Sequence, residues 1–143
     1  MTHDDRARPT SGCEHLDDGE LVARFEACTL PAASYHHREH LRIAFAMLRG
    51  ADFGVAALRF RDALRRYVAA VGAAAKYHET LTWAYLALVH ERMAEEDAAD
   101  SRAFLARHPE LLDHQGGALA RHYDVAAITG SALARRVFVL PSR

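Results

Sequence analysis

Apolar residues recur at helical spacing along most of the chain, and the alternation that predicts strands is almost absent. The clearest stripe lies in residues 52–71, where the spacing i, i+3, i+4, i+7 predicts an amphipathic helix. Its members are Phe53, Ala56, Ala57, Phe60, Leu64, Tyr67, Val68 and Val71. The arginines of this segment fall outside the stripe, so we expect them on a solvated face.

Caps and breaks divide the rest of the chain into further helices. Asp17 or Asp18 is a suitable N-cap for the first helix and Ser34 for the second, and proline or glycine follows or interrupts several segments. The predicted ranges are 19–28, 34–50, 77–95, 101–107, a short segment from 109, and 124–137. These elements predict an all-α, single-domain helical bundle of about five to seven helices.

The domain organisation predicted from this pattern is simple. Residues 1–17 are polar and charged, which is typical of a disordered N-terminal tail. Residues 18–139 form the predicted helical bundle domain, and the last few residues are expected to be a tail.

Composition excludes some classes of partner. No apolar run reaches the roughly 18–20 residues that span a bilayer, and the first residues lack the apolar core of a secretory signal. We therefore expect a cytoplasmic protein with no membrane partner. Residues 34–76 hold eight Lys/Arg against three Asp/Glu, but the net charge of the chain is −1. This modest basic excess does not favour a nucleic-acid partner.

Three histidines lie within five positions at the start of the predicted helix 34–50. On a wheel with about 100° per residue, His37 and His40 fall on the apolar face, and His36 lies at its margin. Arg42 falls with the other arginines of this helix on the far side, and Glu39 is nearly opposite His37. We expect Arg42 and Glu39 to face water.

The segment 77–95 carries a second candidate constellation. His78 falls on the core stripe near the beginning of this helix, and Glu79 lies at the edge of that stripe. If the bundle runs up-down-up, His78 lies at the same end as His37 and His40. Imidazoles from facing helices can then share one metal ion, and Glu79 can be a fourth ligand or a general base. A hydrogen-bonded network without metal is the alternative.

Two functions follow from these constellations. The first is a metal-dependent enzyme acting on a small-molecule substrate, with its reaction undecided among hydrolysis, lyase chemistry and oxygenation. It would use one divalent transition metal, either Zn, Fe, Cu or Ni. The alternative is a metal-free helical domain that binds a small molecule or a protein partner. An apolar flank of helix 52–71 or 77–95 could also form a homodimer.

Six residues carry the predicted site. Arg135 is included because a guanidinium can hold a substrate carboxylate or phosphate, although it could equally be structural. Tyr85, Trp83 and Thr80 are expected to line the pocket. The metal ligands are His37, His40 and His78, and the catalytic residues are Glu79, Tyr77 and Arg135; no organic cofactor is predicted.

Several motifs together resemble a family of small, all-helical bacterial proteins to which no activity is assigned. The resemblance covers about residues 20–140, and "YHETLT" is its most specific piece. It implies a helical fold and a bacterial source, and no chemistry. It favours His37 over His36 and Arg135 over Arg136. The matching positions are Leu30-Pro31, His37, His40 and Leu41, Tyr77 to Thr80 with Thr82, and Ser131, Ala134, Arg135 and Phe138.

Overall fold

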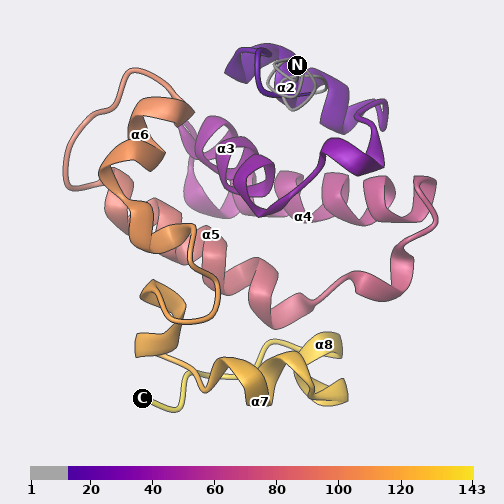
Figure 1. The fold of residues 1–143 in the computed structure, drawn as a ribbon, viewed down its shortest axis with the longest axis vertical. Coiled ribbons are helices and arrows are strands. Elements are labelled where there is room, and N and C mark those ends of the chain that lie inside the picture. The colour runs from indigo at the N-terminus through magenta and orange to yellow at the C-terminus, as the bar shows by residue number, and fades with distance from the viewer. Residues whose placement is uncertain (1–12) are drawn as a thin grey trace, which may run out of the picture.

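Helices make up the framework of the described chain. A computed structural model describes residues 13–143, and within them it has seven α-helices, four 3₁₀ turns and no strand (Figure 1). The predicted all-α, single-domain bundle is confirmed. The α-helices are α2 (Asp18–Glu26), α3 (His37–Leu48), α4 (Phe53–Ala70), α5 (Glu79–Met93), α6 (Ser101–Arg107), α7 (Val125–Thr129) and α8 (Ala132–Arg136). The 3₁₀ turns are η1 (Ala32–Ser34), η2 (Ala74–Lys76), η3 (Pro109–Leu111) and η4 (Ala118–Arg121).

Helix α3 lies at the centre of the bundle and contacts α2, α4, α5 and α6 (Figure 1). It is therefore buried nearly all the way round, including two of its charged side chains. Glu39 is 4% exposed and Arg42 is 2% exposed. The prediction that these two residues face water is wrong, because α2, α6 and the segment before α2 cover the side of α3 that the wheel left to solvent.

Arg42 is satisfied by a set of oxygen acceptors from distant parts of the chain. Its Nε donates to Ser101 Oγ at 2.8 Å, and its two Nη atoms donate to the carbonyl oxygens of Cys13 (3.2 Å) and Leu16 (2.8 Å). Nη2 also forms an ion pair with Asp18 Oδ1 at 3.3 Å. Asp18 in turn accepts from the backbone N–H of Ser101 at 2.8 Å. A buried guanidinium needs this many acceptors, and they fix α2 and α6 against α3.

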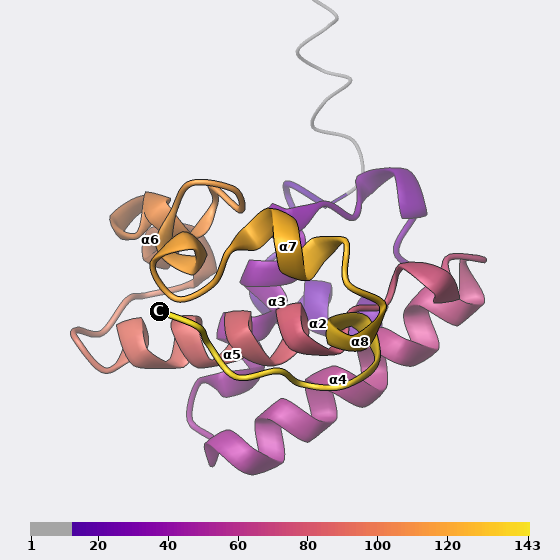
Figure 2. The same cartoon turned by 90° about the horizontal axis from the view of Figure 1, so that it is seen from below.

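The predicted domain boundaries change at both ends. Cys13 and Leu16 are core residues with 1% and 5% exposure, so residues 13–17 belong to the bundle and not to a tail. The rest of the predicted tail, residues 1–12, lies outside the described residues. At the other end, Thr80 Oγ1 donates to the carbonyl of Val137 (2.8 Å) and accepts from the N–H of Val139 (3.0 Å). The C-terminal segment thus runs along α5 as part of the fold (Figure 2).

Two helix boundaries also differ from prediction. Ser34 lies in η1, and the chain stays extended until His36, whose N–H donates to Glu39 Oε1 at 2.9 Å. Helix α3 therefore begins at His37. The predicted helix 124–137 is divided into α7 and α8, because α7 ends at its C-cap Gly130 and Ser131 caps the start of α8 by accepting from the N–H of Ala134.

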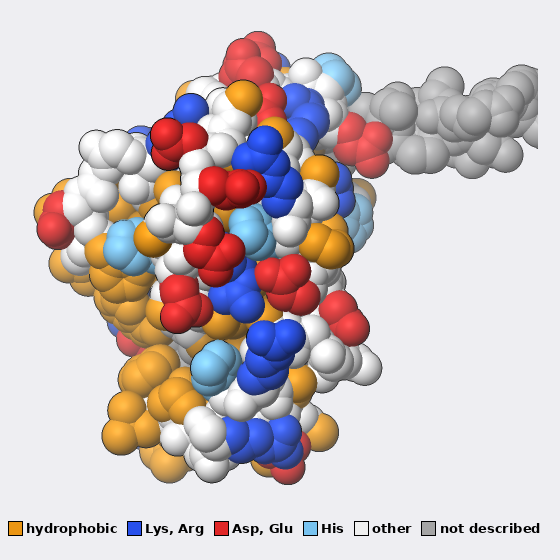
Figure 3. Space-filling view, turned by 90° about the vertical axis from the view of Figure 1, so that its left-hand side faces the viewer, with side chains coloured by type: hydrophobic (Ala, Val, Ile, Leu, Met, Phe, Trp, Pro, Cys, Tyr) orange, Lys and Arg blue, Asp and Glu red, His pale blue; other side chains and the backbone are white. Residues whose placement is uncertain are grey.

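The surface carries charged side chains of both signs (Figure 3), as the near-zero net charge of the sequence indicates. Seen from the α6 side, Lys/Arg and Asp/Glu side chains are interspersed, and hydrophobic side chains gather along one edge (Figure 3). Among residues 13–143, no helix has both the length and the apolar character needed to cross a bilayer.

We predict that Arg42→Met destabilises the fold by about 3–5 kcal/mol, because it removes the hydrogen bonds to Ser101, Cys13 and Leu16 and leaves the part-buried carboxylate of Asp18 without its counter-ion. Chemical denaturation measures this. The control is Arg59→Met, which breaks a surface ion pair with Glu26 and should cost about 0–1 kcal/mol. Equal losses in the two variants would contradict the central role of Arg42. If Arg42→Met does not fold, Ser101→Ala tests the same network more mildly.

Candidate functional site

A cavity of about 1250 Å³, open to solvent on one side, lies between α3, α4, α5 and the region of α7. Most of the surface of its wall is apolar, because aliphatic side chains and the ring carbons of tyrosines contribute to it, and histidines and tyrosines supply most of its polar groups. The structure brings His37, His40 and His78 to this one cavity, as the up-down-up interpretation predicted. The polar lining residues are Tyr35, His37, His40, Tyr67, Lys76, Tyr77, His78, Thr82, Tyr85, His114, Gln115 and Thr129.

His37 presents a hydrogen-bond acceptor. Its Nε2 lies 2.8 Å from the carbonyl oxygen of Leu111, and because a carbonyl only accepts, Nε2 carries the proton. Burial lowers the pKa of His37, so the ring is neutral near pH 7 and Nδ1 holds a lone pair. The ring packs against Tyr85 and His114, with centroids 4.7 and 5.2 Å away.

His40 forms a pair with a tyrosine. Its Nδ1 lies 3.0 Å from the hydroxyl of Tyr35, and its ring packs edge-on against Phe60. Burial, with a smaller contribution from His37, lowers the pKa of His40 to about 3. The ring is therefore neutral at physiological pH. Its Nε2 has no hydrogen-bond partner within residues 13–143, and it can donate or accept depending on which way the Tyr35 hydroxyl points.

His78 has a structural role. Its Nδ1 accepts from the N–H of Leu81 at 3.1 Å, which caps α5, and its Nε2 donates to the carbonyl of Ile128 at 2.9 Å. Both ring nitrogens are occupied, so neither is available to a metal ion. His78 thus holds α7 against the start of α5. The described part of the chain contains no group of three His, Cys, Asp or Glu side chains placed to hold a metal ion.

Glu79 points away from the histidines into its own cluster. Its carboxylate accepts from the Tyr77 hydroxyl (2.6 Å), Arg61 Nε (3.0 Å) and Trp83 Nε1 (3.0 Å). Burial favours the neutral acid, but these hydrogen bonds outweigh it and lower the pKa of Glu79. A carboxylate saturated by donors is a weak base, and Glu79 does not line the cavity. The geometry therefore favours a structural role for it.

Arg135 also bonds to the fold. Its Nη1 lies 3.3 to 3.5 Å from the carbonyl oxygens of Ala75, Lys76 and Tyr77, and its Nη2 lies 3.4 Å from that of Thr129. These contacts join α8 to η2 and to the end of α7. Of the three predicted catalytic residues, only Tyr77 lines the cavity itself.

Tyr85 stands out among the lining residues. It is 4% exposed, and its hydroxyl is the one buried side-chain polar atom without a hydrogen-bond partner among residues 13–143. An unpaired buried hydroxyl costs free energy, so native structures rarely keep one without a reason such as a bound molecule.

Sequence reasoning missed Tyr35, Lys76 and His114 as site residues. Tyr35 directly precedes His36 and lies outside any helical periodicity, because it joins η1 to α3. His114 lies in the irregular stretch after η3, far in sequence from His37, His40 and His78. Only the packing of that stretch against α3 brings it to His37.

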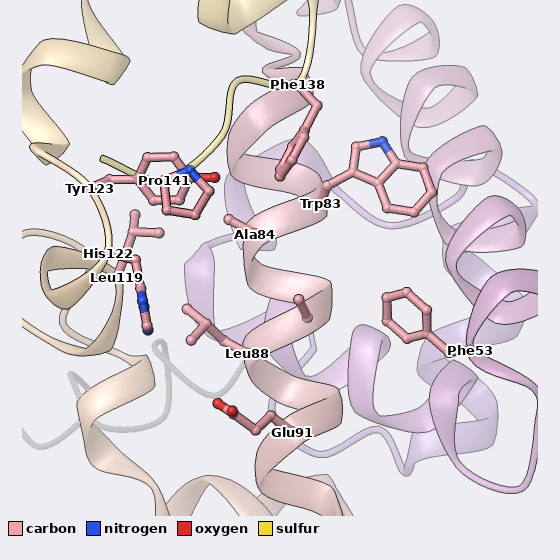
Figure 4. Close-up of a pocket in the computed structure, with 11 residues that line it drawn as sticks. Phe53, Trp83, Ala84, Leu88, Glu91, Leu119, His122, Tyr123, Phe138 and Pro141 are labelled. Carbon is pink, nitrogen blue, oxygen red and sulfur yellow. The ribbon is translucent and has the colours of Figure 1, made fainter. Parts of the chain in front are cut away.

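A separate outer groove of about 510 Å³ lies on the other side of α5. Trp83 and Phe53 lie on one side of that helix, and Leu119, Tyr123 and Pro141 lie on the other (Figure 4). Leu119 is the one lining residue that the groove shares with the cavity. Because nearly all the groove's lining is apolar, it offers few groups for chemistry.

The fold and the cavity define a class: an all-α protein with a largely apolar cavity between its helices, in which His37 and His40 are neutral. No protein-family model, curated protein or solved structure gives a significant match to the chain. The site is therefore interpreted from its own geometry, and the resemblance to a bacterial family stays a prediction.

We predict opposite effects for two tyrosine-to-phenylalanine changes. Tyr85→Phe should leave the free energy of unfolding unchanged or raise it by up to about 1 kcal/mol, because it removes a buried hydroxyl that has no partner. Tyr67→Phe should lower it by about 1 kcal/mol, because the Tyr67 hydroxyl donates to the carbonyl of Leu30 at 3.0 Å. Urea denaturation of the ligand-free protein checks both, and a comparable loss in Tyr85→Phe would show that its hydroxyl is paired.

We also predict a loss of stability in acid that traces to His40. Because its folded pKa, about 3, lies below the unfolded value near 6.5, the unfolded chain binds a proton that the folded chain does not. The contribution of His40 is complete above pH 6.5 and falls as pH decreases below it. Between pH 7.5 and pH 5, the wild type should lose about 2 kcal/mol more than His40→Gln. His90→Gln, at an exposed position, should follow the wild type.

Proposed function

We propose that this protein binds a small molecule in the cavity without a metal ion. The observation that carries the proposal is the unpaired, buried hydroxyl of Tyr85 in the wall of a cavity of about 1250 Å³. Small-molecule sites are typically concave and mostly apolar, with a few convergent polar groups that fix the orientation of the ligand. Tyr85, His37 and His40 are such groups.

Because His37 and His40 are neutral, the part of the cavity wall that they form suits a neutral part of the ligand. His37 offers an acceptor at Nδ1, and His40 offers a donor or an acceptor at Nε2. Both pKa values are lowered by burial, so neither ring carries charge at neutral pH. A ligand with a hydroxyl or carbonyl group can satisfy Tyr85 and one histidine at once.

A metal-dependent enzyme is the second candidate. The observation that favours it is the His37–His40 pair, whose ring centroids lie 6.3 Å apart and whose rings each keep one nitrogen without a partner among the described residues. The pair alone supplies two ligands, and water or substrate would have to supply the rest. The expected divalent metal, the cytoplasmic location, the bacterial source and the homodimer all stay predictions.

We predict that N-phenyl-1-naphthylamine, a neutral fluorescent probe, binds the cavity with a dissociation constant of tens of micromolar or tighter. Binding should shift its emission to the blue and raise the melting temperature. Val125→Trp places a large ring at the half-buried cavity wall and should weaken binding at least tenfold. Ala87→Trp places the same ring in the outer groove and should leave cavity binding within twofold.

The outcomes separate the candidate functions. If Val125→Trp keeps an intact fold by circular dichroism and binds the probe with unchanged affinity, the proposed cavity site is overturned. If Val125→Trp does not fold, Val68→Trp is the variant to measure in its place. Metal analysis of untagged protein distinguishes the second candidate. One Zn, Fe, Cu or Ni per chain that is lost in His40→Ala would favour the metal-dependent enzyme.

A further inference from the structure

The charged groups around the cavity are unevenly distributed. Lys76 is the one charged side chain in its lining, and no Asp or Glu of the described chain belongs to that lining. A second hollow adjoins the cavity and shares four lining residues with it, namely Val68, Tyr77, Thr129 and Gly130. Its lining adds arginines and again no acidic residue. These arginines are Arg65, Arg135 and Arg136.

The positive charges at this rim are not neutralised. Arg135 donates to backbone carbonyls, which carry no net charge, and one of these carbonyls belongs to Lys76. Arg65 lies over the ring of Tyr77, with its guanidinium carbon 5.1 Å from the centroid. The nearby carboxylate of Glu79 is already paired with Arg61 at 3.0 Å. Within residues 13–143, none of the four rim cations forms an ion pair with a carboxylate.

The other end of the cavity, at Tyr85, lacks these positive charges. Burial raises the pKa of Tyr85 strongly, and the carboxylate of Asp113 adds to this effect. The Asp113 side chain accepts from the N–H groups of Gln115 and Gly116, so it is fixed beside this end. Because the Tyr85 hydroxyl is buried and no Lys or Arg lines this end, a neutral hydroxyl or carbonyl group suits it better than an anion.

The two ends are separated by a stretch of wall in which His78 and Thr82 lie among apolar side chains. His78 and Tyr85 are seven residues apart, which corresponds to about 10 Å along α5. Between the ends, the wall is formed by side chains such as Leu64, Leu81 and Val125. A molecule that fits this wall has an elongated apolar body.

We infer that the ligand is an amphipathic organic acid: its anionic group pairs with Lys76 at the rim, its apolar body fills the cavity, and a neutral polar group reaches Tyr85. This inference rests on the proposed function of the cavity and adds the chemical class of the ligand. Lys76 is exposed on η2, so it can meet the anionic group without a change of fold.

A matched pair of probes tests the charge preference. 8-Anilinonaphthalene-1-sulfonate has the ring system of N-phenyl-1-naphthylamine and adds one sulfonate. The wild type should bind the sulfonate probe about three to ten times more tightly than the neutral probe, as expected for one partly exposed ion pair. Lys76→Gln should remove this advantage and leave the neutral probe within twofold, whereas Lys76→Arg should keep most of it. Raising the salt concentration should weaken only the sulfonate probe.

Failure of this inference differs from failure of the proposed function. If both probes bind equally and Lys76→Gln changes neither, while Val125→Trp weakens both, the cavity site stands and the acid preference is overturned. If Val125→Trp, correctly folded, changes neither probe, the cavity site itself is overturned. Ala87→Trp reports any sulfonate probe that binds in the outer groove, and a large effect there would also count against the cavity.

Discussion

The burial of one guanidinium determines how the bundle is assembled. Arg42 lies in the middle of the central helix and is 2% exposed, so all of its donors must find acceptors inside the protein. Those acceptors come from residues 13–18 and from Ser101, segments more than eighty residues apart in the chain. The cost of an unpaired buried charge therefore forces the N-terminal segment and α6 to meet on one side of α3. Packing of apolar side chains alone is less directional and would fix the relative position of the N-terminal segment and α6 less specifically.

The cavity occupies the side of α3 that this network leaves uncovered. His37 and Arg42 are five positions apart, about 140° around the helix, so fixing Arg42 against α2 and α6 turns His37 toward α5. His78 completes the arrangement from the other helix by capping α5 and binding the carbonyl of Ile128. The three histidines thus have different roles. His78 positions α7, whereas His37 and His40 present neutral ring nitrogens to the cavity.

Much of the fold follows from local signals, and the site follows from them only in part. Helix α4 was predicted almost to the residue, because its cap Asp52 and its apolar stripe are both local. The convergence of His37, His40 and His78 on one cavity was also predicted, since it needs only the order and direction of the helices. The wheel was wrong for Arg42 because a wheel assumes one solvated side, whereas a central helix has none. The tautomers and partners of the histidines could not be predicted, because they depend on carbonyls as distant as Leu111 and Ile128.

The size of the cavity follows from the way the C-terminal part of the chain is broken. A continuous helix over residues 124–137 could pack its apolar side directly against α5, but Gly130 and Ser131 divide it into two short helices held by Arg135 and His78. Isolated helices this short are only marginally stable, so these polar ties fix α7 at the start of α5, while α8 packs directly against α5. Dense packing is the usual state of protein interiors. A ligand with an apolar body would add van der Waals contacts between α5 and the region of α7, which couples occupation of the cavity to the stability of the C-terminal half.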